Sequence, residues 1–248
     1  MNNHSSARYI VTGHRRGLGA AITQALLTQG HTVLGMSRGL LYPQANTRPS
    51  ILHEAIVDLA QPAQVCEWIA SNALTQFLSG ARRAVLINNA GVVGPVGQTG
   101  QLSTAEIFNS INANIASVIA LTNAFVGATH RSTDRRVVHI SSGAGRSPYS
   151  GWTVYCASKA ALDHHARSVA AEQHPGLRIE SVAPGIIDTD MQAEVRRTPL
   201  EQFPMREKFE RLQSERLLTP PDVAAGQLLA HVQSDQFGAN VCTDLRSL

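Results

Sequence analysis

A glycine-rich turn between an apolar run and a helical pattern most constrains the fold of this chain. Residues 8–12 (RYIVT) are mostly apolar, residues 13–19 read GHRRGLG, and residues 20–29 space their apolar side chains as a helix does. A strand, a glycine turn and a helix start in this order direct backbone N–H groups and the positive end of the helix at a phosphate. The spacing Gly-x-x-x-Gly-x-Gly departs from the common dinucleotide pattern Gly-x-Gly-x-x-Gly, so a plain tight turn is the alternative.

The rest of the chain alternates between short apolar runs and helical patterns, which predicts a parallel sheet with helices on both faces. Strands are expected at 8–12, 32–36, 51–57, 84–88, 137–141, 179–183 and 240–243. Helices are expected at 20–29, 62–78, 104–129, 153–173 and 221–233. With 248 residues, of which 43% are hydrophobic, the chain is predicted to form one α/β domain over 1–248, a doubly wound Rossmann fold of about seven strands.

Tyr155 and Lys159 form the pair that most strongly indicates chemistry. Lys159 is one of only two lysines among 21 basic residues, the other being Lys208. A lysine four residues after a tyrosine lies one helical turn along the same face, so the ammonium can approach the phenol. At about 4 Å and an effective dielectric near 20, the ammonium favours phenolate by about 4 kcal/mol, which predicts a tyrosine pKa about three below its ordinary value of about 10. An ordinary helical Tyr/Lys pair is the alternative interpretation.

Further motifs give the chain a resemblance to the short-chain dehydrogenase/reductase family, from Tyr9 to about Asp244. The family's cofactor turn Thr-Gly-x-x-x-Gly-x-Gly is matched by residues 12–19, and its Asn-Asn-Ala-Gly by residues 88–91. A serine stands thirteen residues before the tyrosine, at Ser142, and a Pro-Gly-x-x-x-Thr segment covers residues 184–189. The family's active-site asparagine fits Asn114 best, with Asn112 as the competing choice.

The resemblance implies an NADP(H)-dependent oxidoreductase. Tyr155 would give its proton to a carbonyl oxygen, Ser142 would hydrogen-bond that oxygen, Lys159 would hold the nicotinamide ribose and Asn114 would hold a water. The residues implied to bind the cofactor are Gly13, Arg15, Arg16, Gly17, Leu18, Gly19, Ser37, Arg38, Asp58, Leu59, Asn89, Ala90, Gly91, Tyr155, Lys159, Pro184, Gly185, Ile187 and Thr189.

The residues after the second strand predict which nicotinamide cofactor is used. A site for NAD would place an acidic side chain there to bind the ribose 2′-hydroxyl, whereas this chain has Ser37 and then Arg38. Arg38, with Arg15 or Arg16 of the glycine turn, can bind a 2′-phosphate through charge-assisted contacts. We therefore expect NADPH. Asp58 matches the family position beside the adenine, and a helix N-cap is its alternative role.

The substrate is indicated by the segments 141–152 and 188–192, which look most like the benzil reductase and sepiapterin reductase-like branch of the family. Tyr149, Trp152, Met191 and Phe203 could form an apolar wall for a ketone or diketone, or could equally be packing residues. Sepiapterin reductases have an acidic residue in their closing Gly-Ala-x-Val segment. Here that segment, residues 238–241, reads GANV and is followed by Cys242, which argues against a pterin. A 3-oxoacyl-thioester reductase and a non-catalytic NADPH-binding regulator remain as alternatives.

Residues 188–218 have no strand pattern and are longer than an ordinary connection, which predicts a lid over the substrate. An exposed helical excursion is the alternative. The long helices at 104–129 and 153–173 resemble those through which family members form dimers and tetramers, so a homodimer or homotetramer is expected.

Composition argues against other classes of partner. The net charge is +3 and the pI near 9.0, but the arginines are dispersed and 5% of residues are aromatic, so no nucleic acid is expected. Residues 131–136 (RSTDRR) are expected to be a solvated loop. Residues 1–8 lack a signal-peptide core and no apolar run is expected to reach about 18 residues, so a cytoplasmic location without a membrane is predicted. Three widely spaced cysteines and the adjacent His164 and His165 suggest no disulfide and no metal site.

Overall fold

The computed structural model describes residues 7–42, 49–131 and 133–248, and it contains a sheet of seven parallel strands in the order β3-β2-β1-β4-β5-β6-β7. The strands are β1 (Ala7–Thr12), β2 (Thr32–Ser37), β3 (Leu52–Ile56), β4 (Arg83–Asn88), β5 (Asp134–Ile140), β6 (Leu177–Ala183) and β7 (Cys242–Asp244). This confirms the predicted doubly wound sheet. The order reverses between β1 and β4, where open sheets of this kind bind ligands beyond the carboxyl ends of the strands.

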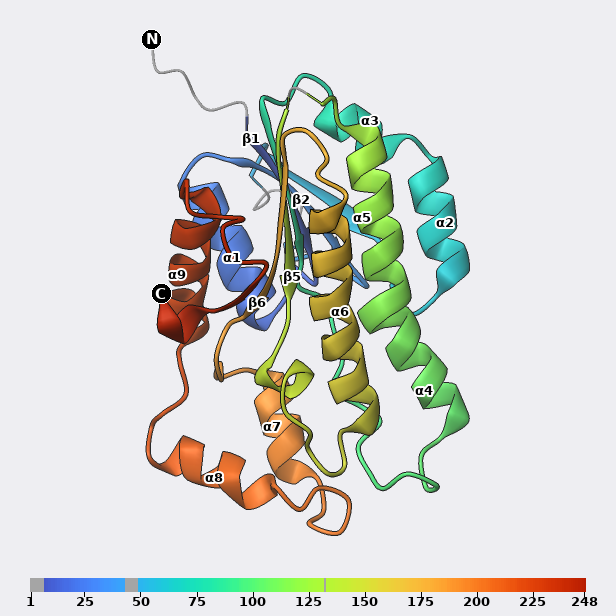
Figure 1. Ribbon diagram of the computed structural model, residues 1–248, viewed down its shortest axis with the longest axis vertical. Coiled ribbons are helices and arrows are strands. Elements are labelled where there is room, and N and C mark those ends of the chain that lie inside the picture. The colour runs from blue at the N-terminus through green and yellow to red at the C-terminus, as the bar shows by residue number, and fades with distance from the viewer. Residues whose placement is uncertain (1–6, 43–48, 132) are drawn as a thin grey trace.

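Helices cover both faces of the sheet (Figure 1). The helices α1 (Gly17–Thr28) and α9 (Pro221–Gln233) lie on one face. On the other lie α2 (Pro62–Ala70), α3 (Ala73–Leu78), α4 (Thr104–Ile111), α5 (Ser117–Ala128) and α6 (Thr153–Ala171). Successive side chains of each strand therefore enter different cores. On β1, Tyr9 and Val11 pack with α1 and α9, whereas Ile10 packs with α3 and α5.

The helices α7 (Asp190–Arg197) and α8 (Arg206–Ser214) lie beyond the carboxyl ends of the strands, at the bottom of Figure 1. Ile187 and Thr219 form an isolated parallel bridge, and Asp188 N donates to Thr219 O at 3.0 Å. The bridge brings the two ends of the segment together, so α7 and α8 project as one excursion from the sheet.

The helix predicted at 62–78 is broken in two. Asn72 has a φ of 61°, in the left-handed region, and separates α2 from α3. Asparagine tolerates this conformation better than most residues because its short side chain bonds locally. The apolar spacing is the same before and after the break, so the pattern could not indicate it.

The predicted solvated loop at 131–136 is wrong from Asp134 onward. Strand β5 begins there, and the side chains of Arg135 and Arg136 are buried, at 2% and 0% exposure. Arg136 donates to Val232 O and Ser234 O at the end of α9 and pairs with Asp134 at 3.0 Å. These carbonyls and the carboxylate compensate the buried guanidinium.

The long helix predicted at 104–129 contains a π-helical turn, Asn112–Ala116, between α4 and α5. By length and composition alone this 25-residue helix, with a mean hydropathy of 1.4 in its most apolar window, could cross a membrane. The expectation that no such stretch exists was therefore wrong. In this fold Leu121 and Phe125 are buried against the sheet, as in the core helix of a globular domain.

Candidate active site

The glycine turn closes tightly over the end of β1. Gly13 and Gly17 have φ values of 69° and 53°, in the left-handed region that glycine adopts without strain. A Cβ at Gly19 would overlap the carbonyl oxygen of Gly13. The glycines therefore leave space that side chains would otherwise occupy. The first residues of α1 form the second half of this turn, so the positive end of the helix faces the same space.

Thr12 joins this turn to the segment after β4. Its Oγ1 accepts hydrogen bonds from the backbone N–H groups of Asn89 and Ala90, each at 3.0 Å, and Asn89 Nδ2 donates to Thr12 O at 2.9 Å. The two motifs predicted to bind the cofactor thus meet at the point where the strand order reverses.

Tyr155 lies on the first turn of α6 and Ser142 follows β5. The side chain of Tyr155 is buried, at 8% exposure. Burial raises the pKa of Tyr155 to about 12, although a hydrogen bond with Ser142 acts in the opposite direction. Ser142 Oγ also accepts from the backbone N–H of Ala144 at 3.2 Å, which fixes the position of its hydroxyl group.

Lys159 lies on the same face of α6, but its ammonium is directed elsewhere. Its Nζ donates to Ile140 O at 2.7 Å and is 5.6 Å from the centroid of the Tyr155 ring. Burial lowers the pKa of Lys159 to about 8. The predicted lowering of the phenol pKa is wrong for this geometry, because burial of Tyr155 is the largest influence on that pKa and raises it.

The raised pKa leads to a testable result. A pKa above the ordinary value means that the phenol keeps its proton at a pH where other tyrosines ionise. An ultraviolet difference titration without added cofactor should therefore show equal tyrosinate absorbance for the wild-type protein and Tyr155→Phe up to about pH 10 to 11. One additional tyrosinate in the wild type near neutral pH would contradict this assignment and restore the predicted effect of Lys159.

Asn114 lies in the π-helical turn, and its side chain is on the same side of Gly91 as the Lys159 ammonium. A Cβ built on Gly91 would lie 3.2 Å from Asn114 Oδ1 and 3.7 Å from Lys159 Nζ, so the two side chains flank the same glycine. Asn114 exchanges two hydrogen bonds with the backbone of Val92, each at 2.9 Å. The alternative residue, Asn112, donates instead to Ala60 O. The structure therefore brings Asn114, and not Asn112, close to the Lys159 side chain.

Two of the three arginines proposed for phosphate binding lie near the end of β2. The guanidinium of Arg15 packs over Gly39, where a Cβ would lie 2.6 Å from Arg15 Nη1, and Arg38 is exposed beside it. Ser37 Oγ donates to Gly39 O at 2.6 Å and so shapes the loop. Arg16 is directed toward Asp190 on α7, at 3.8 Å between exposed side chains.

Other residues predicted to bind the cofactor contribute differently. The side chains of Leu18, Leu59 and Ile187 are each 7% exposed and belong to the cores, so only their backbone can face a ligand. Thr189 packs against Gly17, where a Cβ would lie 3.1 Å from its Cγ2. This contact brings the 184–189 segment, with Pro184 and Gly185, to the glycine turn.

Asp58 lies in the connection between β3 and α2. One of its oxygens, Oδ1, accepts from the backbone N–H of Ala60 at 3.0 Å. The residue that precedes α2 is Gln61, so Asp58 is not the N-cap. It shapes the turn between β3 and α2.

Asp163 is a site residue that the sequence reasoning missed. It is buried at 3% exposure, one turn after Lys159, and its Oδ1 accepts from Ser141 and Ser181, each at 2.7 Å. Its Oδ2 accepts from Arg146 Nε at 3.0 Å. The carboxylate ties α6 to the loop that carries Ser142. The spacing of four from Lys159 was the available signal.

The proposed aromatic wall is largely a packed cluster. Trp152 and Phe203 are 5% and 0% exposed, and their rings stack with centroids 4.5 Å apart. Trp152 also meets the Tyr155 ring at 5.3 Å and the Phe209 ring of α8 at 5.3 Å. Both residues therefore attach α7 and α8 to the body of the protein. The other two wall residues, Tyr149 and Met191, are half-buried at the edge of the cluster.

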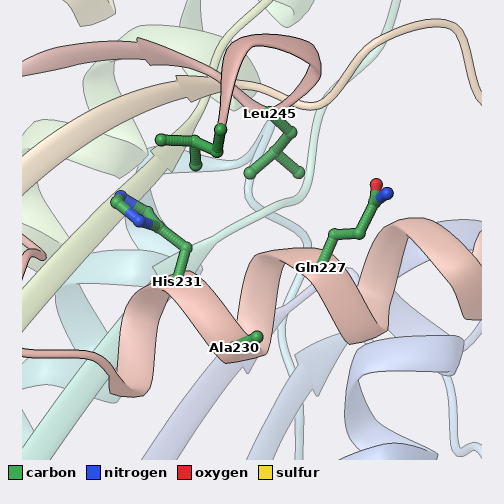
Figure 2. Close-up of a pocket in the computed structure, with 5 residues that line it drawn as sticks. Gln227, Ala230, His231 and Leu245 are labelled. Carbon is green, nitrogen blue, oxygen red and sulfur yellow. The ribbon is translucent and has the colours of Figure 1, made fainter.

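A separate pocket lies between α9 and the C-terminal segment (Figure 2). It is lined by Gln227, Ala230, His231, Leu245 and Leu248. His231 is held by the buried Glu180 at 2.8 Å. None of the residues predicted to act on a substrate lines this pocket.

The sheet order and the helices on both faces define a fold of the Rossmann type, and comparison with known proteins shows that the chain is an oxidoreductase of a particular family. Residues 8–200 match the short chain dehydrogenase family. The chain belongs to this family of short-chain dehydrogenases/reductases.

Two curated relatives are similar over nearly their whole length. Benzil reductase ((S)-benzoin forming) of Bacillus subtilis (strain 168) is 34% identical over 233 residues, covering 90% of this chain and 91% of the relative. Sepiapterin reductase of Mus musculus is 34% identical over 249 residues, covering 94% of each.

Solved structures agree with the family. A short-chain dehydrogenase/reductase from Burkholderia vietnamiensis is 41% identical, with a TM-score of 0.71 and 98% of both chains covered. A short chain dehydrogenase from Burkholderia cenocepacia J2315, solved in complex with NADP, is 25% identical, with a TM-score of 0.73 and coverage of 98% and 96%.

Proposed function

We propose that this protein is an NADPH-dependent carbonyl reductase that converts a ketone or diketone to an alcohol. The observation that carries the proposal is the grouping of Ser142, Tyr155 and Lys159 beside the glycine turn. A phenol that keeps its proton at neutral pH is a donor, which suits reduction.

Each residue has a distinct role in the proposed reaction. Ser142 hydrogen-bonds the carbonyl oxygen, and Tyr155 donates its proton to that oxygen as negative charge develops on it. Lys159 and Asn114, whose side chains flank Gly91, would return a proton to the phenol. When bound, NADPH supplies the hydride.

The residues around the glycine turn fit a dinucleotide. The turn leaves room where side chains would otherwise stand, and the start of α1 favours a phosphate. Ser37 and Arg38 stand where NAD-preferring enzymes place a carboxylate, and Arg38, with Arg15 packed over the neighbouring Gly39, would bind a 2′-phosphate. A family neighbour solved with NADP supports the same choice.

Arg38→Asp should shift preference from NADPH toward NADH. The new carboxylate would repel the 2′-phosphate and accept a hydrogen bond from a 2′-hydroxyl. We expect KM for NADPH to rise and KM for NADH to fall in steady-state assays. Arg131→Asp, the same charge change at an exposed residue just before the amino end of β5, serves as the control and should leave both constants unchanged. Constants that move together in Arg38→Asp would refute the assignment.

Two curated relatives reduce benzil and sepiapterin according to their names, which supports a ketone or diketone as the substrate. An assay of aryl ketones, vicinal diketones, sepiapterin and acetoacetyl thioesters, followed by NADPH consumption, tests this proposal. We expect diketones and aryl ketones to be reduced fastest. Faster reduction of thioesters would favour a 3-oxoacyl-thioester reductase, and binding of NADPH without any turnover would favour a regulator.

We also propose that the protein works in the cytoplasm as a homodimer or homotetramer. Phe108 on α4 is 63% exposed and Ile119 on α5 is 39% exposed, which suits contact with a second copy. Light scattering of the wild-type protein and of Phe108→Asp tests this part of the proposal.

A further inference from the structure

A buried histidine stands inside the glycine turn. His14 has 0% exposure, and its Nε2 is 2.7 Å from Oε1 of Glu54 on β3. Both side chains of this pair are fully removed from solvent. A buried polar pair is costly unless its geometry is satisfied, so it needs a physical reason at this position.

The sheet makes room for this pair at Gly35, in the middle of β2. Gly35 pairs with Glu54 in the register of β2 and β3, and with Val11 in the register of β1 and β2. A Cβ on Gly35 would overlap Cγ and Cδ2 of His14. Glycine weakens the interior of a strand and marks a close approach of another group. Gly35 is therefore the space that the imidazole ring occupies.

Glu54 joins the turn to a third segment. Its Oε1 also accepts from the backbone N–H of Leu41, at 2.6 Å, in the loop that follows β2. This loop carries Arg38 and Gly39, and Gly39 is in contact with the guanidinium of Arg15, the residue next to His14. One carboxylate oxygen thus fixes the glycine turn and the β2 loop relative to each other.

We propose that His14 and Glu54 are positioning residues for cofactor selectivity. They hold Arg15 and Arg38 at the spacing at which both contact the 2′-phosphate of NADP(H). The proposal rests on the NADPH preference proposed above and extends it to two residues that do not touch the cofactor phosphate themselves. Without the pair, each arginine keeps its charge but is no longer held in one position. A mobile guanidinium binds phosphate more weakly, because ordering it on binding costs conformational entropy.

Direct binding measurements test the proposal. NADPH and NADH are titrated separately into wild type, His14→Ala and Glu54→Ala, with nicotinamide fluorescence as the readout. We expect Kd for NADPH to rise about tenfold in either variant while Kd for NADH changes less than about twofold. At saturating NADPH and ketone, kcat should stay within about twofold, because Tyr155 and Ser142 are untouched.

The chain offers a matched control and a rescue. His174 and Glu172 form an exposed pair of the same 2.7 Å length, so His174→Ala should leave both binding constants unchanged. Glu54→Gln keeps an oxygen that accepts from Leu41 N and His14 Nε2, and it should retain most of the NADPH preference. Equal weakening of NADPH and NADH in the Ala variants would show a merely structural role and overturn the proposal.

A double variant separates packing from positioning if His14→Ala folds poorly. In His14→Ala with Gly35→Ala, the added methyl group occupies space vacated by the ring. The melting temperature should recover while NADPH binding stays weak. Recovery of NADPH binding together with stability would overturn the proposal. If the wild type itself binds NADPH and NADH equally, the cofactor preference has failed, whereas a preference kept by both Ala variants refutes only the role of the pair.

Discussion

Tyr155→Phe is expected to lower kcat by about a hundredfold or more while leaving the Kd for NADPH nearly unchanged. The substitution removes the hydroxyl group and its proton but keeps the ring, which is buried against Trp152. General acid catalysis contributes about a hundredfold to ten-thousandfold to a proton transfer of this kind. Single-turnover reduction of a diketone by preloaded NADPH measures the chemical step directly.

The matched control is Tyr9→Phe. Tyr9 is also buried, at 1% exposure, and its hydroxyl accepts a hydrogen bond from Gln233 far from the proposed active site. This variant should keep kcat within about twofold. If Tyr155→Phe retains more than about a tenth of wild-type kcat, Tyr155 is not the proton donor and the proposed mechanism fails.

Trp152→Ala is expected to lower the free energy of unfolding by about 3–5 kcal/mol, because it removes a large aromatic side chain from a buried cluster. The indole stacks on Phe203 and contacts Phe209 and Tyr155, so the cavity would open between α6 and the 190–214 segment. Equilibrium denaturation in urea, followed by far-ultraviolet circular dichroism, measures the loss.

Trp68→Ala provides the comparison, because Trp68 is the other tryptophan of the chain and lies half-buried on α2. We expect a clearly smaller loss of stability from it. If Trp152→Ala instead keeps full stability and raises only KM for aryl substrates, Trp152 lines the substrate site and the cluster is not the support of α7 and α8.

The fold could be predicted from the sequence because each unit repeats the same physical signal. Apolar runs buried on both faces alternate with helices, and the glycine turn sets the first crossover. Local departures were invisible to that signal. Asn72 interrupts a helix whose apolar spacing continues. The charges of Arg135 and Arg136 concealed that the strand expected at 137–141 begins at Asp134, because the carbonyl groups that accept hydrogen bonds from these arginines lie in other parts of the chain.

Tyr155, Ser142 and Lys159 could be grouped as candidate site residues because their spacing is local to one helix and one strand end. The effect of Lys159 on the phenol pKa could not be predicted from the sequence. It depends on the hydrogen bond that the ammonium donates to Ile140 O, which belongs to another element. The roles of His14 and Asp163 likewise depend on Glu54, Ser181 and Arg146, which the fold brings in from other elements.

The π-helical turn at Asn112–Ala116 makes the position of the Asn114 side chain depend on the number of residues in its helix. A π turn is equivalent to one residue inserted into an α-helix, and such insertions are often found at functional sites. Deleting one residue before Asn114 would let the helix relax to regular α geometry. Each residue of an α-helix turns the side chain by about 100°, so the amide would swing away from Gly91 and Lys159. A surface loop can gain or lose a residue without moving the site. In the helix that carries Asn114, the same change would move the amide that takes part in the proposed proton transfer, so the number of residues in this helix is fixed by that reaction.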